Sequence, residues 1–409
     1  MHIGIAGPIA TTDVLPLLDD TRSTLPAGTE GAPLLATIIT ELIGRGHRVS
    51  AFTLSNALPL REDGAVVARG PSFELHYVPN RPRAWPFNGR RPGRIVDLYA
   101  FERRGLRRAI ESARPDVIHA HWAYEFAWAA LRTGIPHVVT CHDSPLVVAR
   151  FEPNVRQGAY RWLRAAIAWH VLRNASRVTT VSPYMVDEVQ SLCRVLVSVV
   201  PNPIAQRSRR LDPVARTSRT QVLMVCNGWG PRKNGNAGLL AYALLRQRLP
   251  GAELLLIGSG TEQGGPAWQE WRRQGAPGRV IFNGAMAHEA VLDAMAASDL
   301  MLHPALEESF GAVLAEAMSV GLPVVAGRHS GAVPWVVGDS GALVDVTRPQ
   351  AMADAMLALL IDSQTLCALS ERGRERVAAC FSPAAVVAKY EQEYEFALSR
   401  SSLMPRVPA

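Results

Sequence analysis

This chain contains almost no lysine, no clustered cysteines and no long apolar run. Only two of its 43 basic residues are lysines, Lys233 and Lys389. The five cysteines are scattered, without the spacing of a metal site or a disulfide framework, which favours a reducing, cytoplasmic location. No stretch reaches eighteen apolar residues, so a membrane-spanning helix is not expected. The first twenty residues lack a basic start, so no secretory signal is expected either.

The composition is that of a folded protein with large cores. Of the 409 residues, 48% are hydrophobic and 19% are charged, which argues against a disordered chain. This length predicts two or three domains. No internal repeat with the period of a solenoid is found.

The net charge of +7 is concentrated in one segment, Arg81–Arg108. This segment contains nine arginines and only two acidic residues, Asp97 and Glu102, so the rest of the chain is formally neutral. Such a patch suits an anionic acceptor or a peripheral contact with an anionic membrane surface. A solvated surface loop explains it equally well. Nucleic acid is not expected, because no zinc finger or aromatic RNA-binding signature accompanies the arginines.

Short apolar runs alternate with helical patterns, which predicts parallel α/β sheets in two domains. Residues 201–220 are rich in Pro, Arg and Ser and form the expected linker. We therefore expect one domain over residues 1–205 and a second over 206–380. A terminal helix over 381–398 and a tail over 399–409 follow. Polar residues end several expected strands, where ligands of parallel sheets gather.

The most informative motif is HPALEESFGAVLAEAMSVGLPVV, which begins at His303. An expected strand ends there, a loop carries Glu308, and Phe310–Gly311 lead into a helix that contains Glu316. Glycine lets the backbone approach a ligand closely, and the free N–H groups of a helix start favour an anion. The two carboxylates suit the vicinal hydroxyls of a ribose or a sugar. If the helix begins near Ser309, both face one cleft.

This motif resembles the E-x7-E signature of glycosyltransferase family 4, a large family of retaining enzymes with the GT-B fold. Further similar segments follow in the family's order, among them the glycine-rich first loop TEGAP, the strand ends VIHAHW and VVTCHD, and the turn GWGPRKNGN. The resemblance covers about residues 25–395 and implies two Rossmann-like domains that face a central cleft, with the C-terminal helix returning toward the first domain. It also implies transfer of a sugar from a nucleotide-sugar donor to an acceptor. That acceptor is a glycan, a lipid-linked molecule or a small molecule.

The resemblance also assigns roles to individual residues. Lys233 is similar to the lysine that neutralises the diphosphate, Glu308 to the residue that contacts the donor sugar, and His142 to the active-site histidine. The donor-binding residues that it implies are Gly31, Asn227, Arg232, Ser309, Phe310, Gly311 and Glu316. His121 is a candidate on the acceptor side, although a structural role suits His119 and His121 equally well. No metal or other cofactor is implied, because the nucleotide sugar is itself the substrate.

The chain departs from the family pattern in its phosphate-binding turn. The family carries an arginine five or six residues before the lysine, where this chain has Asn227 or Gly228. Arg232 is the candidate replacement. Two other functions stay open: a nucleotide-sugar epimerase on the same fold and, because one cation is missing, a non-catalytic sugar-nucleotide-binding partner subunit. Detection of sugar transfer to an acceptor separates a transferase from both.

Overall fold

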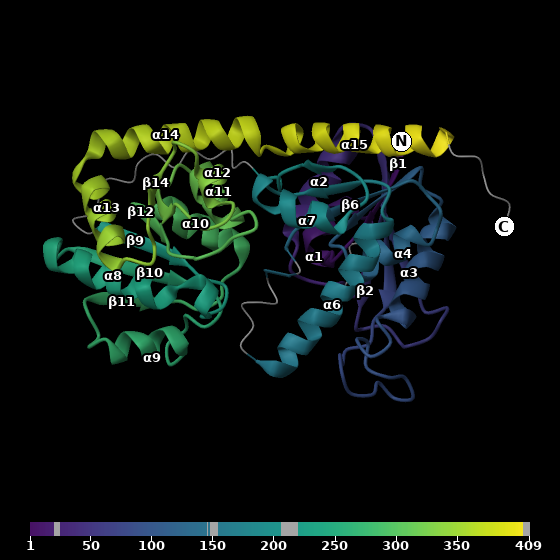
Figure 1. Ribbon diagram of the computed structural model, residues 1–409, viewed down its shortest axis with the longest axis horizontal. Coiled ribbons are helices and arrows are strands. Elements are labelled where there is room, and N and C mark those ends of the chain that lie inside the picture. The colour runs from purple at the N-terminus through teal and green to yellow at the C-terminus, as the bar shows by residue number, and fades with distance from the viewer. Residues whose placement is uncertain (20–24, 145, 148–153, 206–219, 404–409) are drawn as a thin grey trace. The chain divides into compact units, whose positions relative to one another are not determined.

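The computed structural model describes residues 1–19, 25–144, 146–147, 154–205 and 220–403, which fold into two units (Figure 1). Unit 1 contains Met1–Pro203 together with the chain from Pro383 onward, and unit 2 contains Ile204–Ser382. The chain therefore passes between the units twice. Residues 206–219 of the expected linker lie outside the described residues.

Unit 1 is built on a sheet of eight strands in the order β3-β4-β2-β1-β5-β6-β7-β8. All neighbouring strands are parallel except β3, which runs antiparallel to β4. The strands are β1 His2–Ala6, β2 Arg48–Ser55, β3 Val66–Arg69, β4 Phe73–Pro79, β5 Val117–His121, β6 His137–Cys141, β7 Val178–Thr180 and β8 Val197–Val199. Most are buried on both faces, as parallel strands between helical layers are.

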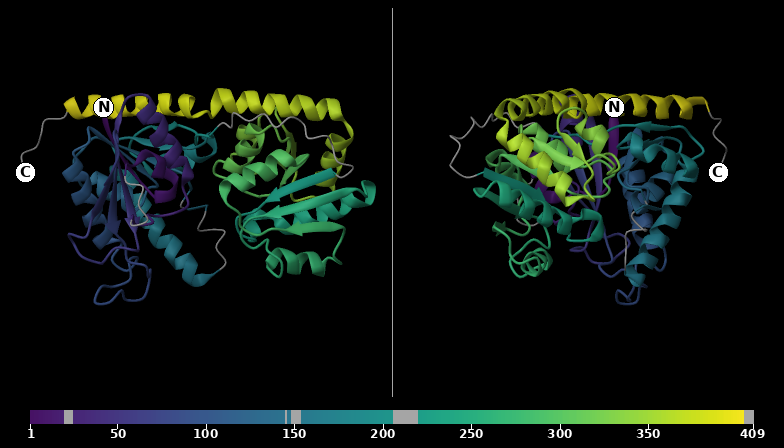
Figure 2. Two further views of the ribbon diagram at one scale, coloured as in Figure 1. Left: turned by 180° about the vertical axis from the view of Figure 1, so that it is seen from behind. Right: turned by 60° about the vertical axis from the view of Figure 1, so that its left-hand side comes forward.

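The helices of unit 1 pack on this sheet through apolar faces. They are α1 Thr11–Val14, α2 Pro33–Gly44, α3 Ala100–Ala113, α4 Glu125–Leu131, α6 Val155–Asn174, α7 Val186–Leu192 and α15 Pro383–Leu403. In α2 the buried residues recur every three or four positions, which places them on one face. The last helix, α15, shares a core with α2 (Figure 2). Residues 399–403 of the expected tail are thus helical, and residues 404–409 lie outside the described residues.

Unit 2 is built on a parallel sheet of six strands in the order β11-β10-β9-β12-β13-β14. Its strands are β9 Thr220–Val225, β10 Ala252–Ile257, β11 Arg279–Phe282, β12 Leu300–His303, β13 Val324–Gly327 and β14 Ala342–Val344. Its helices are α8 Gly235–Arg248, α9 Pro266–Arg273, α10 His288–Ala297, α11 Ala312–Ser319, α12 Val333–Val337, α13 Pro349–Ile361 and α14 Ser363–Cys380. A separate apolar core lies between this sheet and helices α8 and α13.

The strand order reverses its direction once in each unit. In unit 1 the reversal lies between β1 and β5, and in unit 2 it lies between β9 and β12. Loops after the two central strands diverge at such a point and leave a crevice at the carboxyl edge of the sheet, where ligands of open α/β sheets bind. Within the described residues no single helix is both long and apolar enough to cross a membrane, although one bent pair beginning at α13 meets those criteria together.

Candidate active site

Lys233 and Glu308 meet at the reversal point of unit 2. Lys233 lies in the turn between β9 and α8, and Glu308 lies in the loop between β12 and α11. Lys233 Nζ donates to Glu308 Oε1 at 2.5 Å, and both side chains are largely buried. The two loops are also joined through their backbones, since Leu306 N–H donates to the carbonyl of Arg232 at 2.8 Å. The structure therefore brings together two residues that the sequence separates by 75 positions.

A histidine and a second ion pair surround this contact. His303, the last residue of β12, is 1% exposed, and its Nε2 lies 3.4 Å from Glu308 Oε1. Arg232 donates to the carbonyl of Glu307 at 2.8 Å, and its guanidinium lies 3.6 Å from Glu308 Oε2. Arg232 thus places a second cation beside Glu308. Arg232, the expected replacement for the missing family arginine, is therefore close to Lys233, the lysine that it would assist.

The two adjacent carboxylates have opposite pKa shifts. Burial alone would raise the pKa of Glu308, but the contacts with His303 and Lys233 outweigh burial and hold this pKa well below its usual range. For Glu307 burial dominates and raises the pKa, although Arg232 opposes it. Glu308 is therefore a fixed anion, and Lys233 supplies the nearest opposite charge.

The helix expected near Ser309 begins later, at Ala312. Gly311 stands at the N-cap of α11 and has a left-handed backbone with a φ of 87°. The helix therefore starts only after Gly311. The Phe310 side chain is buried against Trp335 and Phe381. Ser309 lies in the same loop and is partly exposed. The loop that carries Glu308 leads directly into the start of α11.

Glu316 belongs to the second turn of α11, and its carboxylate contacts α10 rather than Lys233 or Glu308. Its Oε1 lies 3.0 Å from Nε2 of His288, the first residue of α10. Both side chains reach solvent, so the contact is weak and open to exchange with a hydroxyl group of a ligand. Asn227 follows β9 and is exposed, so it lies at the same edge of the sheet.

In unit 1 the expected histidines form a hydrogen-bonded pair at the ends of neighbouring strands. His121 ends β5, and His142 directly follows β6. His121 Nδ1 lies 2.8 Å from His142 Nε2, and His142 Nδ1 lies 3.0 Å from Oδ1 of Asn202. The ring of Trp122 covers His142 at a centroid distance of 4.2 Å. Both ring nitrogens of His142 therefore have partners within unit 1.

His119 has a structural network of its own. Its two ring nitrogens lie 2.8 Å from the Tyr394 hydroxyl and 2.7 Å from the Thr140 hydroxyl. Tyr394 belongs to α15, so the last helix fixes the orientation of a β5 side chain. Burial lowers the pKa of His119 and of His121 well below the usual value, and it lowers the pKa of His142 to about 3. All three imidazoles are neutral at physiological pH.

A cavity of about 350 Å³ lies at the carboxyl edge of the unit 1 sheet. Its walls include loop residues that follow β1, β4, β5 and β6, together with partly exposed residues of α6; among them are Pro8, Asn80, Trp122, Tyr124, Asp143 and Arg164. Tyr99 and Trp122 hold a left-handed backbone with φ of 62° and 64°. Such conformations are unfavourable for aromatic residues and concentrate at functional sites. Gly31, with a φ of 112°, is exposed in the loop before α2.

The polar wall of this cavity is a tyrosine–arginine cluster. The Arg164 guanidinium lies 3.7 Å from the ring centroid of Tyr124 and donates to Glu125 at 3.2 Å. It also donates to the Tyr99 hydroxyl at 3.1 Å. Phenol and carboxylate groups beside an aromatic ring suit a polyhydroxylated ligand, because rings stack on sugar faces and oxygens bind hydroxyl groups.

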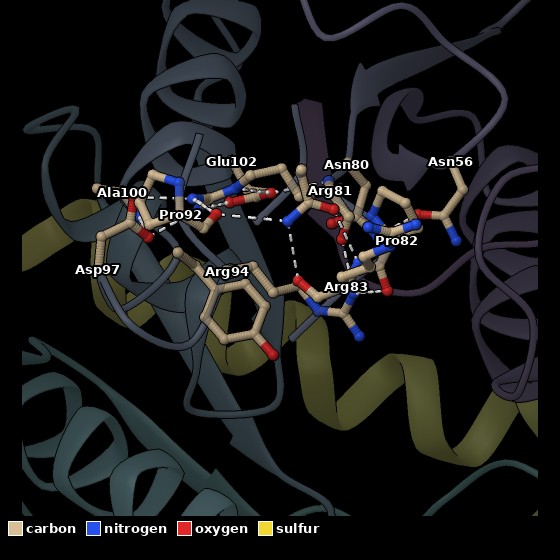
Figure 3. Close-up of polar contacts among 12 residues, drawn as sticks. Asn56, Asn80, Arg81, Pro82, Arg83, Pro92, Arg94, Asp97, Ala100 and Glu102 are labelled. Carbon is tan, nitrogen blue, oxygen red and sulfur yellow. Dashed lines mark hydrogen bonds and ion pairs between the residues drawn. The ribbon is translucent and has the colours of Figure 1, made fainter. Parts of the chain in front are cut away.

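The Arg81–Arg108 segment is not the free cationic surface that its composition indicates. Arg81 is completely buried and binds both acidic residues of the segment, with contacts of 2.6–2.9 Å to Glu102 and 2.7–2.8 Å to Asp97 (Figure 3). Arg94 donates to backbone carbonyls, and Arg91 packs over the ring of Phe101. Several of the nine charges therefore stabilise the fold, while Arg83, Arg90 and Arg104 are among those that remain exposed.

Comparison with known families identifies both halves of the chain. The model of Glycosyltransferase Family 4 matches residues 33–206, and the model of Glycosyl transferases group 1 matches residues 219–362. The chain belongs to glycosyltransferase family 4. It is an enzyme of the glycosyltransferase class, as its sequence motifs predict.

Individual relatives agree with this assignment. The glycosyltransferase is 29% identical over 296 residues to N-acetyl-alpha-D-glucosaminyl L-malate synthase of Bacillus anthracis, a match that covers 68% of this chain and 74% of the relative. It is 24% identical over 301 residues to the uncharacterized glycosyltransferase YqgM of Bacillus subtilis, covering 71% and 80%.

Solved structures confirm the GT-B fold. Sucrose-phosphate synthase of Thermosynechococcus elongatus superposes with a TM-score of 0.72 at 20% identity, covering 98% of this chain and 100% of that one. The Anabaena HepE protein in complex with UDP and glucose gives a TM-score of 0.66 at 19% identity, covering 97% and 100%. The two parallel-sheet α/β units that the sequence predicts are therefore confirmed.

Sequence reasoning did not select four residues that the geometry brings into contact with the expected ones. His303 and Glu307 contact Glu308 and Arg232, and Asn202 and Trp122 contact His142. His303 ends a strand and Trp122 directly follows one, so the position of these two at the carboxyl edge was a usable signal. Glu307 was hidden because it is adjacent to Glu308, which the motif already explained.

Proposed function

We propose that this glycosyltransferase transfers a sugar from a nucleotide-sugar donor to a hydroxylated acceptor with retention of anomeric configuration. Unit 2 binds the donor, and the cavity of unit 1 takes the acceptor. The observation that supports this best is the Lys233–Glu308 contact at the reversal point of unit 2, beside the start of α11. The HepE structure contains UDP and glucose, and another similar structure, of E. coli, contains UDP-2-fluoro glucose, which supports a nucleotide-sugar donor here.

The charges of this contact suit departure of a nucleoside diphosphate. Negative charge grows on the diphosphate as the bond to the anomeric carbon breaks, and a preorganised cation stabilises it. Lys233 supplies that cation, with Arg232 nearby, and the N–H groups at the start of α11 add a favourable dipole. When Lys233 turns to phosphate, Glu308 is released to accept a hydrogen bond from a hydroxyl group of the donor sugar. Glu316 accepts from the ribose hydroxyls in place of His288.

Retention follows if the acceptor attacks the face from which the diphosphate leaves, with a phosphate oxygen taking the acceptor proton. This route needs no metal ion and no protein base. His142 then serves as a neutral group that orients a sugar hydroxyl, as its low pKa requires. The enzyme acts in the cytoplasm, where nucleotide sugars are available. Its acceptor is a glycan, a lipid-linked molecule or a small molecule.

Thermal-shift measurements with UDP-, GDP-, ADP- and TDP-sugars test the donor site, because a ligand of the native state raises the melting temperature. We expect one nucleotide class to stabilise the enzyme. The shift should be reduced in Lys233→Ala and Glu316→Ala. It should be unchanged in Lys389→Ala, a matched control because Lys389 is the only other lysine and is exposed on α15.

Incubation of the selected donor with acceptor extracts then tests the reaction. A transferred sugar whose anomeric proton coupling matches that of the donor supports retention. An inverted product would contradict the retaining mechanism, and formation of only an epimerised donor would contradict transfer. No stabilisation by any nucleotide sugar would contradict the donor site itself.

A further inference from the structure

Asn202 connects the candidate histidines to the place where the chain leaves unit 1. It follows β8 and stands one residue before Pro203, the last residue of unit 1 before the chain enters unit 2. Its side chain is 8% exposed. Oδ1 of this buried amide lies 3.0 Å from His142 Nδ1. An amide at this position is therefore held in contact with an imidazole that lies 60 residues earlier in the chain.

This contact determines the tautomer of two rings. A carboxamide oxygen only accepts hydrogen bonds, so His142 Nδ1 carries the proton and donates it. His142 Nε2 then has only a lone pair, and it accepts from the protonated Nδ1 of His121 at 2.8 Å. His121 Nε2 is left as a buried acceptor with no hydrogen-bond partner among the described residues. The chain of donors runs in one direction, from His121 through His142 to Asn202.

The surroundings keep this pair neutral. The rings that face it are His119 on β5, Trp122 over His142 and Tyr390 of α15, and Tyr394 of α15 lies against His119. Asp143, the next residue after His142, contacts Tyr124. Burial raises the pKa of Asp143, Tyr390 and Tyr394, which weakens any anionic partner for an imidazolium. The neutral amide of Asn202 adds a hydrogen bond but no negative charge. A carboxylate in its place would stabilise a charged ring.

We propose that Asn202 is a positioning residue that holds His142 in the Nδ1–H tautomer, so that its Nε2 meets a substrate hydroxyl as an acceptor and never as an acid. The inference rests on the proposed role of His142 at the reacting sugar. His121 occupies Nε2 until the hydroxyl replaces it.

Two substitutions of one side chain test the inference. Asn202→Asp keeps the shape and the acceptor oxygen but adds a charge, so protonation of His142 should become measurable. We expect a flat pH dependence of kcat between pH 5.5 and 8.5 for the wild type. The Asp variant should show an apparent ionisation within this range. Asn202→Ala should lose about tenfold in kcat, with little change in the donor KM, because the ring is no longer oriented. Asn174→Asp, an exposed Asn at the end of α6, is the matched control.

Nitrogen NMR of ¹⁵N-histidine-labelled protein reads the tautomer without any substrate. The wild type should show a protonated Nδ1 and a bare Nε2 for His142, and the Ala variant should show a mixture. A protonated Nε2 in the wild type would overturn the proposal, as would wild-type kcat and an unchanged tautomer in the Ala variant. If the wild type transfers no sugar, the proposed function fails, while the NMR result still decides whether Asn202 sets the tautomer. Wild-type NMR also decides it if either variant does not fold.

Discussion

The two units place their candidate residues at equivalent points of their sheets but use charge in opposite ways. At the reversal point of unit 2, Lys233, Arg232, Glu307 and Glu308 lie within hydrogen-bond or ion-pair reach of one another. At the carboxyl edge of unit 1, the imidazoles of His121 and His142 are neutral and bind one another. Unit 1 also contains ion pairs: Arg81–Glu102 is fully buried and holds a loop, and Arg164–Glu125 lies in the wall of the cavity.

The difference matches the two chemical tasks that we propose. A departing diphosphate develops charge and needs fixed ions of the opposite sign. A sugar hydroxyl needs oriented donors and acceptors that keep their protons. Buried charge in unit 1 should therefore matter for stability, and buried charge in unit 2 should matter for turnover. Each of the following experiments tests this contrast between the two units.

The largest effect is expected from Glu102→Ala in unit 1. Removing this carboxylate leaves the Arg81 guanidinium completely buried with only Asp97 as an anionic partner. Breaking a buried ion pair from one side costs about 3–5 kcal/mol of the free energy of unfolding. Urea denaturation measures it, and Glu111→Ala is the control because Glu111 lies on the same helix in an exposed pair with Arg107. A loss below 1 kcal/mol would show that the Arg81 network does not stabilise unit 1.

Acid should destabilise unit 1 before unit 2. Burial lowers the folded-state pKa of His119, His121 and His142. Below pH 6.5 these histidines therefore bind protons in the unfolded chain but stay neutral in the folded unit. At pH 5.5 each of these histidines lowers the free energy of unfolding by about 1.4 kcal/mol, and the three together lower it by roughly 4 kcal/mol. Glu308 has a depressed pKa and contributes stability above about pH 4.3, which is lost only below that value.

Hydrogen exchange followed by mass spectrometry separates the two units in this experiment. Between pH 7.5 and 5.5, peptides from the unit 1 sheet should lose protection after correction for the intrinsic exchange rate. Peptides from β9 and β12 should keep theirs. Equal losses in both units would contradict the role of His119, His121 and His142 in the acid sensitivity of unit 1.

Much of this architecture was predictable, because alternating apolar runs and helical patterns determine a parallel sheet whatever the surface residues are. The Lys233 and Glu308 loops were also predictable from their motifs. Their contact with each other was not, since it depends on which strands become neighbours. The burial of Arg81 was missed for a related reason. Composition counts charges, but the pairing of Arg81 with Asp97 and Glu102 depends on a local turn that has no periodic signal.

Lys233 tests whether unit 2 needs lysine or only a cation. We expect Lys233→Ala to lose about 100-fold in turnover, or about 3 kcal/mol, the value of a strong charged hydrogen bond. Lys233→Arg should also lose most of its turnover, because a planar guanidinium cannot follow a phosphate oxygen as an ammonium can. Donor affinity should fall less than kcat if the contact strengthens as the diphosphate leaves. Wild-type kinetics in the Lys233→Arg variant would contradict the prediction that this position needs lysine.

The smallest effect concerns membrane contact through the exposed part of Arg81–Arg108. Phe87 is 66% exposed, and Arg83 and Arg90 are exposed nearby in the sequence. Each cation near an anionic surface contributes about 1 kcal/mol and is screened by salt. Phe87→Ser with Arg90→Ser should weaken sedimentation with anionic liposomes at low salt, whereas Arg348→Ser in unit 2 should not. Negligible binding of the wild type at low and high salt would favour the interpretation of the segment as a solvated loop.

The return of α15 to unit 1 has a consequence for the order of events on the ribosome. Val386, Val387, Tyr390 and Tyr394 are all fully buried in the core of unit 1, yet they are synthesised only after the whole of unit 2. Unit 2 is continuous along the chain and can fold as soon as its residues emerge. Unit 1 must wait, with an apolar surface uncovered, until α15 has been synthesised. The unit that is encoded first is therefore the one that is completed last.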